Sequence, residues 1–253
     1  MISLLPRCRS AARHGRAALA AAAVCGVITV VAVTVPAVSP AAAQPAVLGL
    51  DVSDHQLVVD WSAAASHGAQ FAYVKATEGT GFISPDFTPQ YDGAYQAGLL
   101  RGAYHFALPN QSTGAAQASF FVANGGGWTD NGRTLPGALD IEYNPYGAEC
   151  YKLSQSAIVS WVASFADTYE ALTSVWPVIY TTAEWWNTCT GDYRGFASRD
   201  PLWMPTYGSE GSTPPAGWNF YTISQNAPSG TFPGDQDTFN GSTGQLDKFA
   251  TRG

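Results

Sequence analysis

Short apolar segments alternate with helical segments along most of this chain. Four strand-like segments come first, at residues 47–52, 70–76, 101–106 and 137–141, and the first of them is a continuous apolar run that ends in a charge. Two alanine-rich segments of helical character lie among them, at 89–100 and 114–123. Strands that alternate with helices predict a parallel sheet, because each helix returns the chain to the edge from which the next strand starts.

The second half continues this pattern and then loses its helices. A longer helix is predicted over 154–172 with Ser154 as its cap, and its apolar residues recur at steps of three and four: Ile158, Trp161, Val162, Phe165 and Tyr169. Later strand-like segments, in a region rich in Gly, Pro, Ser and Thr, are 177–180, 202–207, 220–224 and 236–239. Seven or eight strands predict an α/β fold, a modified (β/α) TIM-like barrel with an irregular, helix-poor C-terminal third.

The first 43 residues have the pattern of an export signal. An uncharged, Ala/Val-rich run at 17–35 is followed by the small residues Ala41, Ala42 and Ala43, and it is preceded by a basic leader of Arg7, Arg9, Arg13 and Arg16. We expect cleavage before Gln44, secretion of residues 44–253 as one barrel domain, and no membrane association afterwards. The alternative is an uncleaved membrane anchor, because the apolar run is long for a signal.

Charge excludes nucleic acid as a partner. All 19 acidic residues but only eight of the 12 basic ones lie in 44–253, which gives this part a formal charge of −11. Such a surface repels phosphate backbones, and no basic stripe with interleaved aromatic residues is present.

Cysteine usage predicts one disulfide. Cys8 and Cys25 would leave with the signal, so the exported chain keeps Cys150 and Cys189. Two cysteines in an oxidising compartment most simply pair with each other. A catalytic cysteine is the alternative, but no neighbouring residue of either cysteine supports it.

Acidic residues stand at the ends of several predicted strands. Asp51 closes the first strand, Asp140 and Glu142 close the fourth, and Asp235 precedes the last. Strands of a parallel barrel end at one rim, where such barrels carry their chemistry. We therefore expect these four carboxyl groups to converge.

The pair Asp140 and Glu142 is the sharpest of these signals. Residues i and i+2 of a strand project to the same side, so both carboxyl groups would face the barrel mouth. Two close carboxylates cannot both ionise freely, so one pKa is raised. A protonated acid beside an ionised partner is what cleavage of a glycosidic bond requires. A Mg²⁺ site for phosphoryl chemistry is the rival use of four acids, but no phosphate-binding Gly-rich loop or basic clamp accompanies it, and we expect neither metal nor cofactor.

Aromatic residues favour a sugar as the substrate, because their flat faces stack on pyranose rings. The candidates near predicted strand ends are Tyr104, Tyr143, Tyr180 and Tyr207. Glu78 either forms part of the site wall or pairs with Lys75. His105, at the end of the third strand, either hydrogen-bonds at the rim or serves a structural role.

Several motifs occur together in one order. They are Gly-Leu-Asp-Val-Ser at 49–53 with Gln56 and Trp61, FAYVKATEG at 71–79, AGL and GAYHF at 97–106, the pair Asp140 and Glu142, and DQDTFNG at 235–241. This set resembles glycoside hydrolase family 25, the Chalaropsis-type lysozymes or N-acetylmuramidases. The resemblance covers nearly all of 44–253. It departs at 220–225, where the family often has Trp-Gln-Tyr, and at Pro205 within a predicted strand.

The resemblance implies a modified β/α barrel that hydrolyses the β-1,4 bond between N-acetylmuramic acid and N-acetylglucosamine in peptidoglycan. Glu142 would be the proton donor. Asp140 would act as the nucleophile, or would steady the 2-acetamido group of the substrate as that group attacks. Asp51 and Asp235 would complete the acidic site, with Asp237 as the alternative to Asp235.

Two other functions stay open on the sequence. One is hydrolysis of another N-acetylated polymer such as chitin, and the other is an inactive barrel that binds glycans. Retention of all four acids argues against an inactive barrel, because binding alone needs no paired acid. We expect a monomer.

Overall fold

A computed structural model describes residues 45–208 and 213–251. The predicted signal at 1–43 and the cleavage point before Gln44 lie outside the described residues. Within the described ranges, no helix combines the length and apolarity that crossing a membrane requires.

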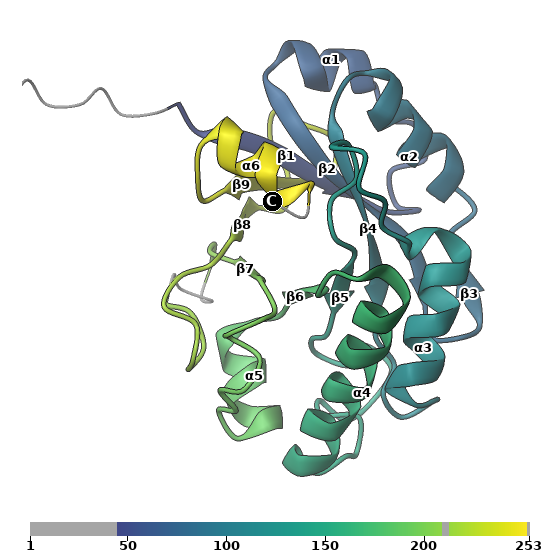
Figure 1. Ribbon diagram of the computed structural model, residues 1–253, viewed down its shortest axis with the longest axis vertical. Helices are drawn as coiled ribbons and strands as arrows, with labels where there is room; N and C mark the ends of the chain where they lie inside the picture. The colour runs from purple at the N-terminus through teal and green to yellow at the C-terminus, as the bar shows by residue number, and fades with distance from the viewer. Residues whose placement is uncertain (1–44, 209–212, 252–253) are drawn as a thin grey trace, which may run out of the picture. The chain divides into compact units, whose positions relative to one another are not determined.

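Eight strands close into a barrel (Figure 1). In chain order they are β1 (Val47–Val52), β2 (Ala69–Glu78), β4 (Leu100–Phe106), β5 (Ala138–Asp140), β6 (Val178–Tyr180), β7 (Leu202–Pro205), β8 (Ile223–Ala227) and β9 (Asp235–Phe239). The ring closes because β1 pairs with β2 on one side and with β9 on the other. A two-residue strand, β3 (Phe82–Ile83), pairs only with the end of β2. The predicted α/β barrel is confirmed.

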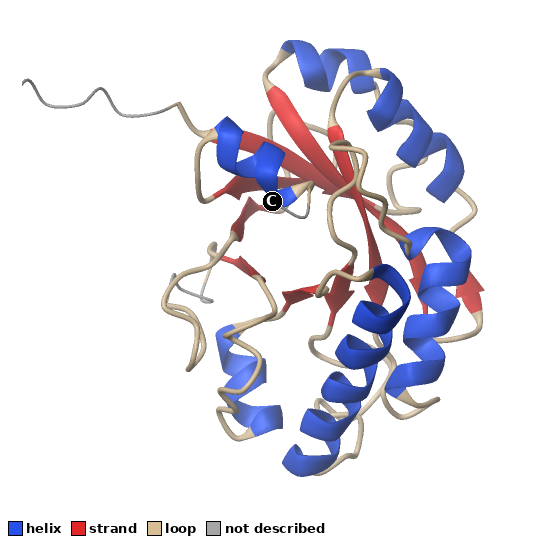
Figure 2. Cartoon of the chain, viewed as in Figure 1, coloured by secondary structure: helices blue, strands red, loops and turns tan. Residues whose placement is uncertain are grey.

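Helices lie outside the strands, as Figure 2 shows. They are α1 (Trp61–Ser66), α2 (Phe87–Gln96), α3 (Gly114–Phe121) with a π-helical turn over Val122–Gly126, α4 (Gln155–Thr173), α5 (Ala183–Thr190) and α6 (Thr243–Phe249). Ser154 caps α4 as predicted, because its side chain accepts a hydrogen bond from the backbone N–H of Ala157. Helix α2 stops at Gln96, short of the predicted residue 100. Gly98 there has a φ of 91°, which ends the helix and lets β4 begin.

The last strand runs opposite to the prediction. β9 is antiparallel to both β1 and β8, whereas the other neighbouring pairs of the barrel are parallel. Asp235 at the start of β9 lies opposite Asp51 near the end of β1. In an all-parallel barrel, a residue at the start of a strand would lie at the opposite rim. The reversed direction of β9 is therefore what brings Asp235 to the rim where β1 ends.

The C-terminal third is poor in helices, as expected, although two short ones were missed. Helix α5 begins after the cap Thr182 and ends at Gly191 in the left-handed conformation, and α6 begins with a capping box of Ser242 and Gln245. Strand β8 starts at Ile223 rather than 220, and the side chain of Phe220 is 64% exposed. Helices of seven or eight residues are too short for a clear apolar repeat.

Side chains fill the barrel interior. Tyr73, Tyr180 and Trp203 pack together, with ring centroids 5.0 Å apart for Tyr73 and Trp203 and 4.9 Å apart for Tyr180 and Trp203. A second core, the outer core, lies between strands and helices and includes Phe121, Phe165 and other large apolar residues. Because side chains fill the barrel interior, we expect a ligand of the barrel to bind at one of its ends.

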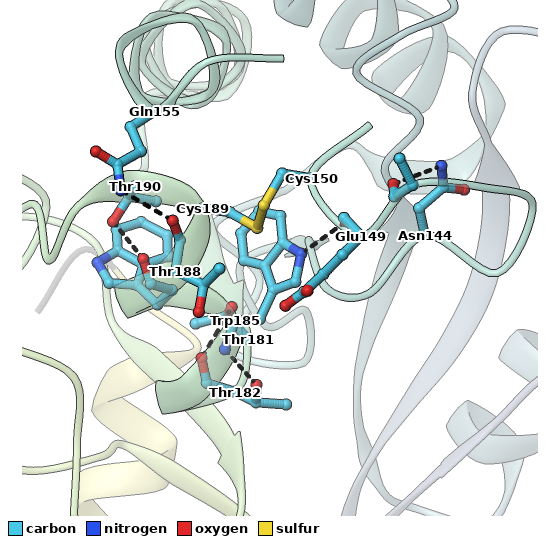
Figure 3. Close-up of a disulfide and its surroundings, with 12 residues drawn as sticks. Asn144, Glu149, Cys150, Gln155, Thr181, Thr182, Trp185, Thr188, Cys189 and Thr190 are labelled. Atoms are coloured by element: carbon cyan, nitrogen blue, oxygen red, sulfur yellow. Dashed lines mark hydrogen bonds between the residues drawn. A yellow bond between two sulfur atoms is a disulfide. The ribbon is translucent and has the colours of Figure 1, made fainter. Parts of the chain in front are cut away.

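The predicted disulfide is present. Cys150 and Cys189 are joined, with their Cα atoms 5.4 Å apart, and the bond links the loop after β5 to helix α5 (Figure 3). Beside it, the indole N–H of Trp185 donates to the backbone oxygen of Glu149, with an N–O distance of 3.2 Å. The loop that follows Glu142 is thus attached to α5 by a covalent bond and a hydrogen bond.

Candidate active site

A cavity of about 210 Å³ opens at the rim where the parallel strands end. All four acids predicted to converge line it: Asp51, Asp140, Glu142 and Asp235. They come from β1, from the end of β5 and the loop after it, and from β9. The barrel therefore gathers carboxyl groups that are up to 184 positions apart in the sequence.

Asp140 is the more deeply buried member of the predicted pair. Strand β5 ends at Asp140, so Glu142 lies on the following loop rather than on the strand. Pairing with β6 continues for one more residue, since the backbone N–H of Ile141 donates to Tyr180 oxygen across 3.0 Å. Ile141 packs into the outer core while its neighbours line the cavity, which keeps the alternation of a strand.

Burial dominates the electrostatics of Asp140. Burial and, next, the charge of Glu142 raise the pKa of Asp140 well above its usual range, and the ammonium group of Lys75 opposes this shift. Among the described residues, no donor reaches Asp140 Oδ1. This carboxyl group is consequently more basic than an exposed aspartate, and it has an unused acceptor.

Lys75 is the lysine that lines the cavity, and sequence reasoning did not place it there. Its ammonium group lies 2.8 Å from Glu78 Oε2, and the hydroxyl of Tyr146 donates to Glu78 Oε1 across 2.6 Å. Glu78 thus pairs with Lys75, and its side chain is not among those that line the cavity. In the sequence, the three-residue spacing of Lys75 and Glu78 indicated this ion pair.

Gln225 connects the two acids on the opposite wall. Its Nε2 atom donates to Asp51 Oδ2 at 2.7 Å and to Asp235 Oδ2 at 3.0 Å. Its Oε1 atom accepts from the hydroxyls of Tyr180 at 2.9 Å and Tyr207 at 3.2 Å. Burial, and then the charge of Asp235, raise the pKa of Asp51 to about 8, and burial also raises the pKa of Asp235. Gln225 was missed because only the folded barrel brings its partners together.

The two aspartates of the last motif lie at different depths. Asp235 lines the cavity, whereas Asp237 lies beneath it with 1% of its surface exposed. The indole N–H of Trp203 donates to Asp237 Oδ1 at 3.0 Å. The structure thus brings Asp235, rather than Asp237, to the cavity wall.

The predicted tyrosines divide into two groups. Tyr104 and Tyr180 line the cavity, and burial raises the pKa of both well above their usual range, so both hydroxyls stay protonated. The hydroxyl of Tyr207 donates to Gln225, and Tyr143 packs against the outer core.

His105 is structural. It is fully buried, its Nε2 atom donates to Gln117 Oε1 at 2.9 Å, and its Nδ1 atom accepts from the hydroxyl of Thr77 at 2.8 Å. Burial lowers the pKa of His105 to about 4, so the ring is neutral at pH 7.

A cavity at the end of a barrel with two close carboxyl groups can donate a proton and stabilise positive charge. A family model, described as "Glycosyl hydrolases family 25", matches residues 50–235. The chain belongs to glycosyl hydrolases family 25. In the part of the chain that the structure describes, no group of three or more His, Cys, Asp or Glu side chains is arranged to hold a metal ion.

Named members of family 25 are close in sequence and in structure. Lysozyme M1 of Streptomyces globisporus is 49% identical over 205 residues, which cover 79% of this chain and 70% of that protein. An N,O-diacetylmuramidase of Arthroderma benhamiae is 44% identical over 222 residues, covering 88% of this chain and 94% of that one. The solved structure of a family 25 lysozyme from Aspergillus fumigatus superposes with a TM-score of 0.80 at 52% identity, covering 82% of this chain and all of that one.

Proposed function

We propose that this family 25 hydrolase is a muramidase that cleaves the β-1,4 bond between N-acetylmuramic acid and N-acetylglucosamine in peptidoglycan. The observation that carries the proposal is the placement of Asp140 and Glu142 on one wall of the rim cavity. Relatives at 44–49% identity, named a lysozyme and an N,O-diacetylmuramidase, support the choice of peptidoglycan.

Glu142 is the proton donor in this proposal. Its proton goes to the glycosidic oxygen as the bond to the anomeric carbon breaks, which leaves an oxocarbenium-like centre. After the leaving sugar departs, the same carboxylate takes a proton from the water that attacks. Glu142 lies on the loop after β5 and lines the cavity, where a glycosidic oxygen can reach it.

Asp140 stabilises the positive charge at the anomeric carbon indirectly, through the 2-acetamido group of the substrate. The 2-acetamido oxygen attacks the anomeric carbon, and the N–H of the same amide donates to Asp140, which takes up the proton as the ring closes. Burial raises the pKa of Asp140 but Lys75 opposes that rise, and the substrate N–H supplies the donor that Oδ1 lacks, so Asp140 accepts the amide proton as a carboxylate when substrate is bound. A covalent bond from Asp140 to the sugar is the competing route. A substrate whose acetamido group is replaced by hydroxyl separates them, since it disables the first route and spares the second.

The proposal includes export. Residues 1–43 are the signal, the mature enzyme starts at Gln44, and it acts as a monomer outside the cell. N-terminal sequencing of protein recovered from the medium tests the cleavage point, and light scattering tests the monomer.

The test of the activity uses residues 44–253 and isolated peptidoglycan, with Glu142→Gln as the matched variant. The expected product is a new N-acetylmuramic acid reducing end that the variant does not generate. New N-acetylglucosamine reducing ends would show that the protein is a glycosidase but not a muramidase. Cleavage of chitin oligomers without release from peptidoglycan would support a chitin hydrolase instead, and binding without cleavage of either polymer would support an inactive glycan-binding barrel.

A further inference from the structure

Asp237 is a buried carboxyl group that the proposed reaction does not use. Its side chain lies under the cavity, with 1% exposed, and Oδ1 accepts from the indole of Trp203 at 3.0 Å. Its other oxygen, Oδ2, is buried, and no N–H or hydroxyl of the described residues donates to it. A charged carboxylate in this place would leave one oxygen without a donor and out of contact with water, which is costly.

The neighbour of Asp237 is a second carboxyl group. In the antiparallel pairing of β1 and β9, Asp237 lies opposite Gly49 and Asp235 lies opposite Asp51, which places Asp237 one pleat deeper than Asp235. The side chains of Asp237 and Asp51 are in direct polar contact. Two carboxylates have no donor between them, so a hydrogen bond across this contact requires a proton on one of the two groups.

The surroundings favour the proton on Asp237. The charged groups that act on it are Asp51 and Asp235, both negative, and its own field acts on Tyr73 of the neighbouring β2. Trp203 of β7 supplies a compensating donor to Oδ1, and among the described residues no donor reaches Oδ2. Burial, and then the charge of Asp51, raise the pKa of Asp237 well above its usual range. Burial raises the pKa of Asp51 as well, but the hydrogen bonds from Gln225, at 2.7 Å, and from Asp237 lower it, so Asp51 is the member of the pair that loses its proton first.

We propose that Asp237 is held as a neutral carboxylic acid that donates its proton to Asp51, and that it thereby acts as a positioning residue for Asp51. Asp51 then receives two hydrogen bonds, one from Asp237 beneath it and one from Gln225 beside it. Two donors from different strands fix the plane of the Asp51 carboxylate at the cavity wall. The positioning role rests on the proposed function, whereas the protonation of Asp237 does not.

Thermal unfolding across pH tests the protonation without any substrate. A carboxyl group with a folded pKa above its unfolded value of about 3.9 binds more protons in the folded state, so its contribution to stability falls as pH rises from about 4. Asp237→Asn removes this fall, because asparagine keeps a donor toward Asp51 and an acceptor for Trp203 but does not ionise. We expect the Tm of the variant minus that of the wild type to increase by about 2–4 °C between about pH 4 and about pH 8.

Asp247→Asn is the matched control, since Asp247 is an exposed aspartate on α6. Its Tm difference from the wild type should not change over the same pH range. A constant or shrinking difference for Asp237→Asn would show that Asp237 is ionised in the folded protein, and would overturn the proposal even if the enzyme is a muramidase.

Kinetics on peptidoglycan test the positioning role. Asp237→Ala, which removes the donor, should lower kcat/KM by about 10-fold or more, and Asp237→Asn should recover most of that loss. Equal losses in both variants would mean that Asp237 works as a charged group, which contradicts the proposal. If Asp237→Ala does not fold, Asp237→Asn is compared with Asp235→Asn. A neutral Asp237 predicts a smaller loss of kcat/KM for Asp237→Asn than for Asp235→Asn, and an equal or larger loss would contradict the proposal.

Discussion

At the scale of single residues, Gln225 joins two of the cavity acids through its side-chain amide. Its amide separates Asp51 from Asp235, and it holds the hydroxyls of Tyr180 and Tyr207 on its other side. Without the amide, two acids and two hydroxyls would lose a partner, and two of these four side chains, Asp51 and Tyr180, are buried. The geometry of that wall therefore depends on one neutral side chain.

Gln225→Leu should weaken both the fold and the activity. Leaving buried polar groups without partners costs about 1–3 kcal/mol each, so we expect the free energy of unfolding to fall by about 2–4 kcal/mol and kcat/KM by about 10-fold or more. Urea unfolding and initial rates on peptidoglycan measure the two effects. Gln96→Leu, at an exposed glutamine that ends α2, is the control. Unchanged stability and rate in Gln225→Leu would contradict the role assigned to the amide.

The sequence predicted the cavity acids because their signal is local. Asp51, Asp140 and Glu142 stand at or just after the ends of apolar runs, which is visible in a few neighbouring residues. Gln225 carries no such signal, since its partner Asp51 is 174 positions away. Lys75 was noticed only as a partner of Glu78, and its position beside Asp140 appears only in the folded barrel.

At the scale of elements, the disulfide fixes the loop that carries Glu142. The bond from Cys150 to Cys189 closes a segment with a sequence separation of 39 and anchors the loop after β5 to α5. Ser154 then starts α4 a few residues later. The chain around Glu142 is thus held between a strand, a disulfide and a capped helix.

Replacing both cysteines with serine should lower stability. Closing a loop of this length is worth on the order of 3–4 kcal/mol in the chain-entropy model, which corresponds to a fall in Tm of about 6–16 °C for a domain of this size. Differential scanning calorimetry of the wild type and the Cys150→Ser/Cys189→Ser variant checks this. A reductant should lower the Tm of the wild type but not that of the variant. A Tm that is the same in both proteins would contradict a stabilising disulfide.

Element type was easier to predict than element direction. The first strand was located to the residue, and α4 to within one residue, because both have clear apolar patterns. The antiparallel direction of β9 was not predicted, because the residues of a strand do not show whether it runs parallel or antiparallel to its neighbours. Helices α1, α5 and α6 were missed because six to eight residues give too few turns for a repeat.

At the scale of the whole chain, net charge determines whether the enzyme and its substrate attract each other at long range. Residues 44–253 carry a formal charge of −11, and peptidoglycan carries carboxyl groups of its own. Attraction over distance is therefore absent, and binding depends on contacts inside the cavity. This differs from a basic lysozyme, which an anionic wall would attract.

Activity should consequently depend little on salt. We expect kcat/KM on isolated peptidoglycan to stay within about two-fold between about 50 and about 300 mM NaCl, because salt screens a repulsion rather than an attraction. Initial rates over this range are the measurement, with a basic lysozyme measured alongside for comparison. A steep loss of activity with salt would show that electrostatic attraction does contribute to binding.

In the proposed reaction, Glu142 protonates the leaving group while Asp140 stabilises the charge at the anomeric carbon. The most direct test compares Glu142→Gln and Asp140→Asn on two muramyl oligosaccharides, one with a natural sugar leaving group and one with a dinitrophenolate, which needs no proton. On the natural substrate both variants should lose about 10²–10⁴-fold in kcat. On the dinitrophenyl substrate Glu142→Gln should recover most of its rate, and Asp140→Asn should not. An equal loss for Glu142→Gln on both substrates would contradict its role as the proton donor.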